Sequence, residues 1–256
     1  MRIVIPARFG SSRLPGKPLL EIAGRPMLAW VIERARHTRA SEVIVATDDE
    51  RVAVLARALS VPVEMTDVHH ASGTDRIAEV ATRRGWSDED IVVNLQGDEP
   101  GMPAALIEQV ATLLQAHPSA SIATLATPIG DPAAYRDPNV VKVVTDSTGR
   151  ALYFSRAPIP WDRDDAQGAR AGIAAAQRHL GLYAYRVGAL RRLAASPVCT
   201  LEQIEKLEQL RALDLGLEIR VERAREIPGP DVNTAEDLAR AAVALTATAR
   251  TNSESS

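Results

Sequence analysis

The first half of the chain alternates short, continuous apolar runs with segments in which apolar residues recur at helical spacing. Strands are predicted at 3–5, 43–46, 61–65, 91–95 and 122–126, and helices at 26–38, 52–59, 74–85 and 103–115, with Asp48 or Asp49 as a cap. Apolar strands between amphipathic helices favour a mostly parallel sheet covered on both faces, and hence an α/β fold. Because ligands bind beyond the carboxyl ends of such strands, the loop at 7–17 and the segment at 96–100 are expected to share one rim.

The second half follows a different pattern. Residues 140–144 and 151–154 are predicted to form a hairpin around a turn in which Gly149 takes a positive φ. An exposed loop is predicted at 162–177, a strand at 179–186, helices at 187–195, 201–215 and 235–248, and disorder at 250–256. In the 201–215 helix, Ile204, Leu207 and Leu210 are expected to face inward. With no repeat and no clean linker, the chain is predicted to form one domain over 1–249, in two halves at 1–130 and 131–249.

Charge and cysteine content narrow the classes of function. Lys and Arg number 30 and Asp and Glu 33, a formal net charge of −3. Without a basic excess, neither nucleic acid nor an anionic membrane is expected as a partner. Cys199 is the only cysteine, which excludes an internal disulfide and fits a reducing compartment. With no signal-peptide pattern and no apolar run near the ~18 residues that span a bilayer, we expect a cytoplasmic protein.

Residues 5–20 gather cations and small residues directly after the first strand. The segment contains Arg8, Gly10, Ser11, Ser12, Arg13, Gly16 and Lys17. Small residues let backbone N–H groups turn toward an anion, and cations can neutralise a polyphosphate. Lys17 is followed by Pro18, so the hydroxyl that a P-loop gives to magnesium is missing, and Gly-x-Gly-x-x-Gly is absent. The loop predicts a phosphate site whose metal is held elsewhere, and it argues against a dinucleotide-dependent oxidoreductase.

This loop resembles the signature of the sugar nucleotidyltransferases, in the form typical of enzymes that activate acidic sugars with cytidine monophosphate. Further motifs at 70–76, 94–100, 153–161, 178–183 and 207–211 follow the order expected of the 3-deoxy-manno-octulosonate cytidylyltransferase family. The resemblance spans roughly residues 2–245. It implies a Rossmann-like three-layer α/β/α fold with an inserted hairpin, through which a homodimer forms near 140–160. It also implies transfer of CMP from CTP to 3-deoxy-D-manno-octulosonate, with release of pyrophosphate, for lipopolysaccharide biosynthesis.

The resemblance assigns the half at 1–130 to the nucleotide. The triphosphate is expected to contact Ala7, Arg8, Ser12, Arg13 and Lys17. Among these, Arg8 and Lys17 are expected to stabilise charge as pyrophosphate departs. Recognition of the pyrimidine is assigned to Ser72, Gly73 and Arg76, and Gln96 is assigned to both substrates. The alternative for 70–76 is a helix cap in which Thr74 and Asp75 serve the first N–H groups.

Asp98 follows the strand at 91–95 and is predicted to bind Mg²⁺, because a carboxylate at a strand end is a suitable hard-oxygen ligand. Glu99, the next residue, is expected to be structural. The family pattern places an Asp before the last helix, whereas this chain has Asn233 there. An amide oxygen can coordinate Mg²⁺ but brings no negative charge, so weaker metal binding is expected. The alternative is that Asn233 or Thr234 caps that helix.

The half at 131–249 is assigned to the sugar and to dimerisation. By resemblance the sugar contacts are Gln96, Arg156, His179, Tyr183, Glu208 and Gln209. His179 could also be a buried, satisfied histidine, and Glu208 and Gln209 could be surface residues. No general base is evident. The rival functions are a cytidylyltransferase for another acidic sugar, such as an 8-amino analogue or a sialic acid, and a nucleotide-binding regulator without turnover, which Asn233 would favour.

Overall fold

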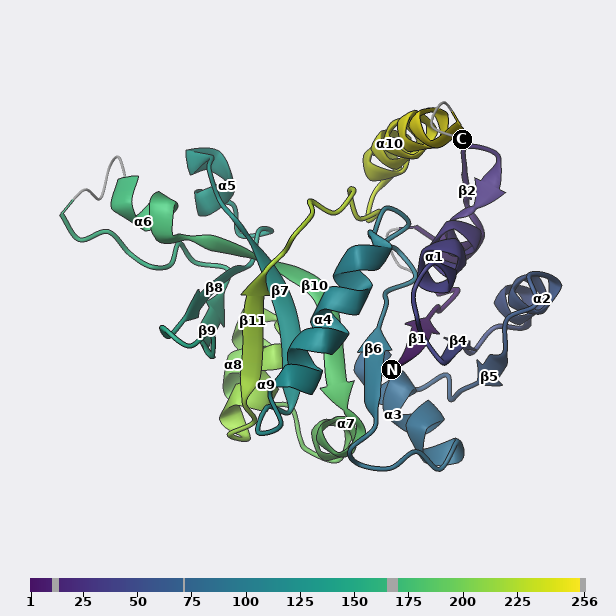
Figure 1. Ribbon diagram of the computed structural model, residues 1–256, viewed down its shortest axis with the longest axis horizontal. Helices are drawn as coiled ribbons and strands as arrows, with labels where there is room; N and C mark the ends of the chain where they lie inside the picture. Colours follow the sequence, from purple (N-terminus) through teal and green to yellow (C-terminus); the bar gives the residue numbers. More distant parts are fainter. Residues whose placement is uncertain (11–13, 71, 165–169, 254–256) are drawn as a thin grey trace.

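The computed structural model describes residues 1–10, 14–70, 72–164 and 170–253, with side chains as far as residue 246. Within this part of the chain, nine strands form one sheet (Figure 1). Its main path runs through β11 (Ile219–Arg223), β7 (Ile122–Pro128), β10 (Gln177–Arg186), β6 (Ile91–Asn94), β1 (Arg2–Pro6), β4 (Glu42–Thr47) and β5 (Val63–Met65). Two further strands, β8 (Lys142–Thr145) and β9 (Ala151–Ser155), extend from β10.

The sheet is mostly parallel, as predicted. β1 pairs in parallel with β4 and β6, β4 with β5, and β7 with β11. β10 is the exception on the main path, because it lies antiparallel between β6 and β7. The carboxyl ends of β1 and β6 therefore meet at one edge, and this confirms that the loops after them share a rim.

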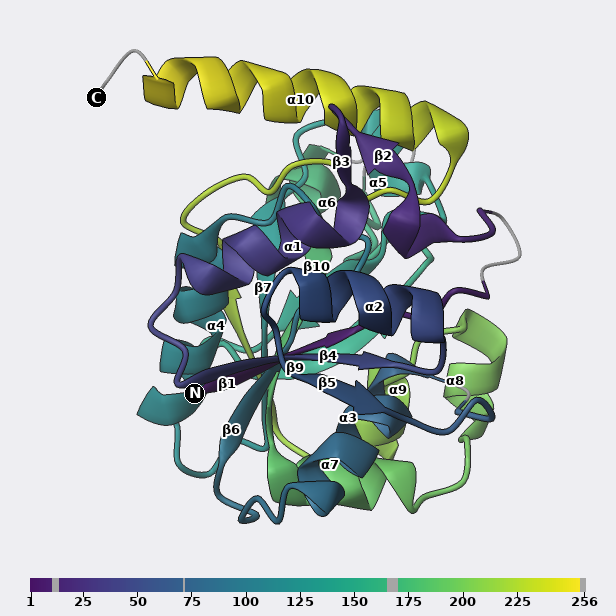
Figure 2. The same cartoon turned by 90° about the vertical axis from the view of Figure 1, so that its right-hand side faces the viewer.

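Helices cover both faces of the sheet and give three layers (Figure 2). One face packs against α1 (Met27–Arg36), α2 (Glu50–Ala58) and α4 (Ala104–Ala116). The other packs against α3 (Gly73–Arg83), α7 (Val187–Ala194) and α9 (Gln209–Asp214). Ile3 and Ile5 on β1 enter the first of these clusters and Val4 enters the second. Successive strand residues point to opposite faces, so a strand covered on both sides must be apolar throughout.

The C-terminal helix packs beside the start of the chain. α10 (Ala235–Ser253) lies over the small hairpin of β2 (Glu21–Ile22) and β3 (Arg25–Pro26). Ala241 and Leu245 pack in one cluster with Ile22 and Trp30, which brings the segment before α10 to the rim. Disorder was predicted from 250, but α10 continues through Ser253; residues 254–256 lie outside the described ones.

The predicted helix at 201–215 is wrong, because the structure has two helices there. α8 (Thr200–Glu205) ends at Lys206, whose φ of 54° is left-handed, and α9 begins at Gln209. Ile204 is 72% exposed rather than inward-facing, whereas Leu207 and Leu210 are buried. Arg211 bridges the break, since its Nε lies 2.8 Å from the Glu202 carboxylate. Because of this break, Glu208 lies at the start of α9 and not in the middle of a continuous helix.

The hairpin β8–β9 is confirmed, and Gly149 in its turn has a φ of +82°. The loop predicted at 162–177 is wrong in its last part, because α6 (Arg170–Ala175) forms there and buries Ile173 against Tyr135 of α5 (Pro132–Arg136). Residues 165–169 of that loop lie outside the described residues. Among the helices of the described chain, none has both the length and the apolar composition that crossing a membrane requires.

Candidate functional site

Three segments that are distant in sequence meet at the rim beyond β1 and β6. Lys17, in the short 3₁₀ turn Lys17–Leu19, places its Nζ 2.6 Å from Asp98 Oδ2 and 3.3 Å from Asn233 Oδ1. Asp98 follows β6, and Asn233 precedes α10. The ammonium of Lys17 thus joins the loop after the first strand to both predicted metal ligands.

A cavity of about 230 Å³ lies beside this contact, and Lys17 is among the residues that line it. Its lining includes the predicted nucleotide residues Ala7, Arg8, Lys17, Ser72, Gly73, Arg76 and Gln96. Ser12 and Arg13 lie outside the described residues. Asp98 and Asn233 line the same cavity. Every predicted nucleotide contact that the structure describes therefore surrounds one space, which we call the nucleotide cavity after these predicted contacts.

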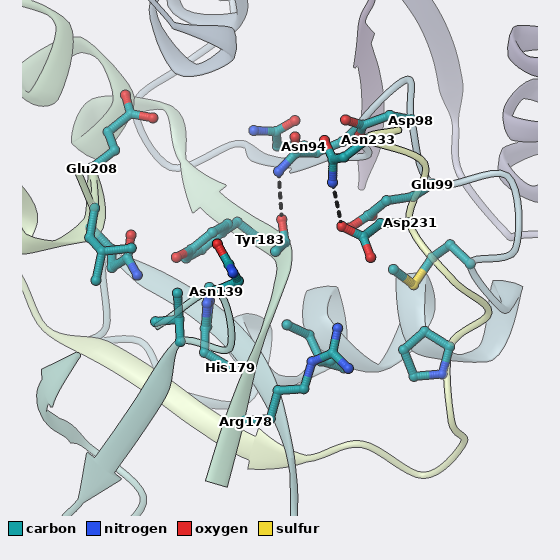
Figure 3. A pocket seen from close by; sticks show the side chains of 18 of the residues that line it. Asn94, Asp98, Glu99, Asn139, Arg178, His179, Tyr183, Glu208, Asp231 and Asn233 are labelled. Atoms are coloured by element: carbon teal, nitrogen blue, oxygen red, sulfur yellow. Dashed lines mark hydrogen bonds between the residues drawn. The ribbon is translucent and has the colours of Figure 1, made fainter. Parts of the chain in front are cut away.

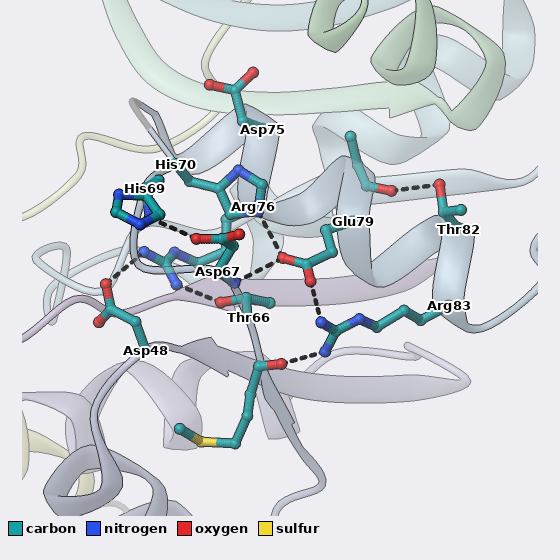
Figure 4. Close-up of polar contacts among 12 residues, drawn as sticks. Asp48, Thr66, Asp67, His69, His70, Asp75, Arg76, Glu79, Thr82 and Arg83 are labelled. Carbon is teal, nitrogen blue, oxygen red and sulfur yellow. Dashed lines mark hydrogen bonds and ion pairs between the residues drawn. The ribbon is translucent and has the colours of Figure 1, made fainter.

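Arg76, which lines the nucleotide cavity, belongs to a network of polar contacts (Figure 4). Arg76 is 3% exposed, and its guanidinium lies 2.9 Å from Asp48 Oδ2 and also donates to Thr66 Oγ1. Asp49, not Asp48, caps α2, which leaves Asp48 available for this ion pair. The guanidinium of Arg76 is thereby fixed within the protein.

Ser72 has two roles at the start of α3. Its Oγ accepts a hydrogen bond of 3.1 Å from the Asp75 N–H, so the cap expected in this motif is present but is made by Ser72 rather than by Thr74 or Asp75. The same Oγ lies 2.9 Å from Glu208 Oε1, and Thr74 Oγ1 lies 3.0 Å from Glu208 Oε2. Glu208 is thus not a free surface residue. It connects the α8–α9 break to the wall of the nucleotide cavity, and burial raises its pKa.

A second cavity, of about 420 Å³, adjoins the first (Figure 3). Its lining includes all the predicted sugar residues: Gln96, Arg156, His179, Tyr183, Glu208 and Gln209. We call it the sugar cavity after these predicted contacts. The two cavities share Gln96, Asp98 and Asn233, which form the junction between them. Arg178, which was not singled out from the sequence, also lines the sugar cavity.

Three buried polar atoms in the sugar cavity have no hydrogen-bond partner among the described residues: Asn94 Oδ1, Glu99 Oε2 and Tyr183 Oη. Asn94 and Tyr183 face each other in the register of β6 and β10, and they are 6% and 7% exposed. Burial and the charges of Asp98 and Asp231 raise the pKa of Glu99 well above its usual value. Buried polar atoms without a partner carry a desolvation cost, so this cavity suits a ligand rich in hydroxyl groups.

Two predicted sugar residues also have structural bonds. His179 Nε2 lies 3.1 Å from Thr124 Oγ1, and its ring packs edge-on to Phe154 at 5.1 Å. Burial lowers the pKa of His179 to about 3, so the imidazole is neutral at physiological pH, as the satisfied-histidine alternative expects. The guanidinium of Arg156 donates from Nε to Glu205 O at 2.6 Å and from Nη1 to Pro138 O at 2.8 Å. Both residues line the cavity while holding its walls together.

The junction has a donor set that fits magnesium. A carboxylate and an amide oxygen converge on one cation, the Lys17 ammonium, at 2.6 and 3.3 Å. Among the described residues, no group of three His, Cys, Asp or Glu side chains could hold a metal ion alone. Magnesium commonly uses one or two protein ligands together with substrate phosphates and water, so a site completed by the nucleotide agrees with this arrangement.

The cap before α10 is made by Thr234 and not by Asn233. Thr234 Oγ1 accepts from the Asp237 N–H at 3.2 Å, and Asp237 Oδ2 accepts from the N–H groups of Asn233 and Thr234 at 2.9 and 2.8 Å. This reciprocal pattern satisfies the first turn of the helix. The side chain of Asn233 is therefore available to Lys17 and to Asp231, whose Oδ2 accepts from Asn233 Nδ2 at 2.7 Å.

A mostly parallel sheet with a cation-bearing loop and an acidic segment at one rim is typical of α/β proteins that bind nucleotides beyond the carboxyl ends of their strands. Comparison with known families agrees, since a cytidylyltransferase family model matches residues 2–219. The chain belongs to this cytidylyltransferase family.

Its relatives point to one branch of the family. The chain is 52% identical over 240 residues to the 3-deoxy-manno-octulosonate cytidylyltransferase of Thioalkalivibrio sulfidiphilus, covering 93% of this chain and 96% of that protein. It is 54% identical over 242 residues to the enzyme of the same name from Methylococcus capsulatus, covering 93% and 94%. A solved structure of CMP:2-keto-3-deoxy-manno-octonic acid synthetase complexed with CTP superposes with a TM-score of 0.88 at 41% identity, covering 96% of this chain and 98% of that one. The resemblance drawn from the motifs is confirmed.

Proposed function

We propose that this protein transfers CMP from CTP to 3-deoxy-D-manno-octulosonate and releases pyrophosphate. The observation that carries the proposal is the pair of adjoining cavities that share Gln96, Asp98 and Asn233. The nucleotide cavity has cations suited to a triphosphate. The sugar cavity has buried polar atoms without a hydrogen-bond partner among the described residues, which suits a polyol. A shared junction allows the two reacting atoms to approach, which is the main requirement for a transfer between two bound substrates.

In this proposal CTP occupies the nucleotide cavity. Arg8 and Lys17 lie at its rim, where their positive charges would stabilise the negative charge that grows on the departing pyrophosphate. Ser72 and Gly73, at the start of α3, form another part of the cavity wall and would face the base. Arg76 supports that wall through Asp48, so its proposed contribution to base recognition is to hold a fixed surface.

The sugar is proposed to enter the second cavity with its carboxylate toward Arg156 and Arg178. Its hydroxyl groups would meet Tyr183 Oη and Asn94 Oδ1, a donor and an acceptor that the described protein leaves without partners. A cavity with unpaired polar atoms discriminates strongly against a ligand that lacks the matching hydroxyl. Glu208 and Gln209 would contact the sugar from the α8–α9 break.

Chemistry at the junction requires an in-line displacement. The anomeric oxygen of the sugar forms a bond to the α-phosphorus of CTP while the bond from that phosphorus to the bridging oxygen of pyrophosphate breaks. The hydroxyl proton passes to solvent. His179 is the imidazole that lines the sugar cavity, and with a pKa of about 3 it is a poor base at neutral pH. We therefore assign no general base.

We propose Mg²⁺ as the cofactor, held by Asp98 and Asn233. When bound, the ion would offset the charge of the triphosphate and lower the pKa of a coordinated hydroxyl. Lys17 would then release its contacts to these two oxygen atoms and turn toward phosphate. The contacts of 2.6 and 3.3 Å support the proposal because they show that both oxygens already face one cation position.

Release of pyrophosphate from CTP, measured with a panel of acidic sugars, tests the proposal. We expect release with 3-deoxy-D-manno-octulosonate well above that with its 8-amino analogue or with a sialic acid, and little release when CTP is replaced by ATP. A higher rate with one of the other sugars would favour the rival substrate. Absence of release with every sugar, together with tight CTP binding, would favour a nucleotide-binding regulator.

We also propose that the protein forms a homodimer through the 140–160 region and works in the cytoplasm. Leu152 on β9 is 53% exposed, and Leu201 and Ile204 on the neighbouring α8 are 42% and 72% exposed. Burying exposed apolar side chains against a second copy would stabilise an assembly. Light scattering measures the mass of the particle in solution for the wild type and for Leu152→Glu. The proposal expects a dimer for the wild type and a monomer for the variant. A single cysteine supports the proposed compartment.

A further inference from the structure

Asp231 lies beside the residue at which this chain departs from its family pattern. Asn233 occupies the place where the motif resemblance expects an aspartate, and Asp231 stands two residues before it. Asn233 Nδ2 donates to Asp231 Oδ2 at 2.7 Å (Figure 3). Both residues line the sugar cavity together with Asp98. A carboxylate is therefore present next to position 233, although not at it.

This contact determines which way the Asn233 amide faces. An asparagine side chain has a donor end and an acceptor end, and the surrounding bonds decide which end points where. Here the donor end meets the Asp231 carboxylate at 2.7 Å, while the acceptor end meets the Lys17 ammonium at 3.3 Å. The reversed amide would place an oxygen against a carboxylate and an NH₂ group against an ammonium. Asp231 thus directs Oδ1 toward the junction.

The backbone fixes Asp231 relative to Asp98. Val232 N donates to Asp98 O at 3.0 Å, and Gly229 N donates to Gly101 O at 3.0 Å. A Cβ at Gly101 would lie 2.9 Å from Gly229 Cα, so only glycine allows the two segments to run this close. The segment before α10 is therefore held alongside the segment after β6, which places Asp231 beside the junction.

Asp231 also contributes charge beside the junction. Asp98 and Asp231 line the sugar cavity together, Asp98 from the segment after β6 and Asp231 from the segment before α10. Two carboxylates thus face the same cavity from different segments. A negative charge close to a cation site but outside its ligand set still strengthens cation binding, because electrostatic attraction does not require direct coordination.

We propose that Asp231 is a positioning residue for the metal site: it holds the Asn233 amide oxygen toward the bound cation and supplies, from outside the ligand set, the carboxylate charge that Asn233 lacks. This inference rests on the proposed function, since it assumes Mg²⁺ with the nucleotide at the junction. It goes further by assigning a role to a residue that the family motif does not include. Asn233 then supplies the coordinating oxygen and Asp231 the negative charge, two functions that a single aspartate at position 233 would combine.

The test compares Asp231→Asn, Asp231→Ala and the exchanged double variant Asp231→Asn/Asn233→Asp with the wild type. Asp214→Asn, which removes an exposed carboxylate at the end of α9, is the matched control. Binding of Mn²⁺ to the enzyme–CTP complex is followed by electron paramagnetic resonance, and the Mg²⁺ concentration for half-maximal turnover is measured in parallel. A thermal melt without nucleotide accompanies each variant.

We expect Asp231→Asn and Asp231→Ala to weaken Mn²⁺ binding by roughly tenfold or more, which is typical for loss of a residue that orients a metal ligand. The double variant has the carboxylate at position 233 and the amide at position 231, so the two side chains can still bond to each other. Its affinity for Mn²⁺ should therefore lie within about threefold of that of the wild type. Asp214→Asn should match the wild type.

Superimposable Mn²⁺ titrations of Asp231→Asn and the wild type would overturn the inference. So would a double variant that binds Mn²⁺ as weakly as Asp231→Asn alone. Because Mn²⁺ binding with CTP needs no sugar, these outcomes remain distinct from a failure of the proposed sugar transfer, which only the sugar panel would reveal.

Discussion

The two cavities differ in how their polar groups are satisfied. Around the nucleotide cavity, Arg76 is paired with Asp48, and Ser72 with Asp75 and Glu208. In the sugar cavity, Asn94 Oδ1 and Tyr183 Oη are buried and have no partner in the described chain. A wall that bonds to itself is rigid before a ligand arrives, whereas unpaired groups gain their bonds only on binding. The walls of the nucleotide cavity are thus bonded before a ligand arrives, whereas the unpaired polar atoms of the sugar cavity carry a cost in stability.

The largest effect is expected for Asp98→Ala at the junction. If Asp98 is the main magnesium ligand, its loss should abolish metal-dependent turnover, since a single carboxylate with water and phosphate forms most of such a site. Initial rates across a magnesium titration measure this. The melt without nucleotide should stay close to that of the wild type because Asp98 lies at the rim rather than in the core. Substantial magnesium-dependent turnover in the variant would exclude this role.

Lys17→Ala should reduce kcat by roughly 100-fold, the usual cost of removing one group that stabilises charge in the transition state. The KM for the sugar should change little, because Lys17 lines the nucleotide cavity and not the sugar cavity. Steady-state kinetics with the sugar varied at saturating CTP separate the two constants. Near-wild-type kcat in a folded variant would show that the loop does not act on phosphate.

Asp48→Asn tests the preformed wall. It leaves the Arg76 guanidinium, 3% exposed, without its charge partner, and breaking a buried pair in this way costs about 3–5 kcal/mol. We expect a lower melting temperature and a raised KM for CTP, with the KM for the sugar unchanged. The comparison between the two cavities would fail if both KM values rose together.

Much of the fold could be predicted because the strands of the first half are covered on both faces. Val4 enters one core and Ile3 and Ile5 the other, which makes the run apolar throughout and easy to recognise. The meeting of Lys17 with Asp98 also followed from sequence, since both come after parallel strands. The local sequence pattern was sufficient to predict these features because each depends on a single physical rule, either burial on both faces of a strand or the meeting of parallel strand ends.

Prediction failed where a tertiary contact overrides local pattern. The helical spacing of Leu207 and Leu210 suggested one helix, yet Lys206 takes a left-handed conformation and Glu208 turns to Ser72. Asn94 ends an apolar strand, and the sequence gives no sign that its oxygen is unpaired, because the cavity beside it is lined by residues from several distant segments, Tyr183 of the neighbouring β10 among them. Likewise, Thr234 and Asn233 are equally good caps by sequence, and only the contacts of Asp237 separate them.

A smaller effect is expected for His179 at low pH. Its pKa is about 3 when folded, below the ordinary value of 6.5, so between these values the unfolded chain binds a proton that the folded chain does not. The histidine therefore favours unfolding increasingly as pH falls from 6.5 toward 3. His179→Gln should lose less stability than the wild type over this range. Melting temperatures from pH 7 to pH 4 measure the difference, and parallel curves would show that His179 does not titrate in this way.

The most direct test of the contrast between the cavities is Tyr183→Phe, measured for stability and for binding together. The substitution removes a buried hydroxyl that has no partner in the described protein, so the melting temperature without ligand should stay the same or rise by a few degrees, since about 1 kcal/mol corresponds to roughly 2–4 °C at this size. The KM for the sugar should rise by roughly tenfold, as expected for a lost hydrogen bond in a buried site, with the Kd for CTP unchanged. A clear fall in melting temperature with an unchanged KM for the sugar would contradict the account, because Tyr183 would then stabilise the fold and not await a ligand.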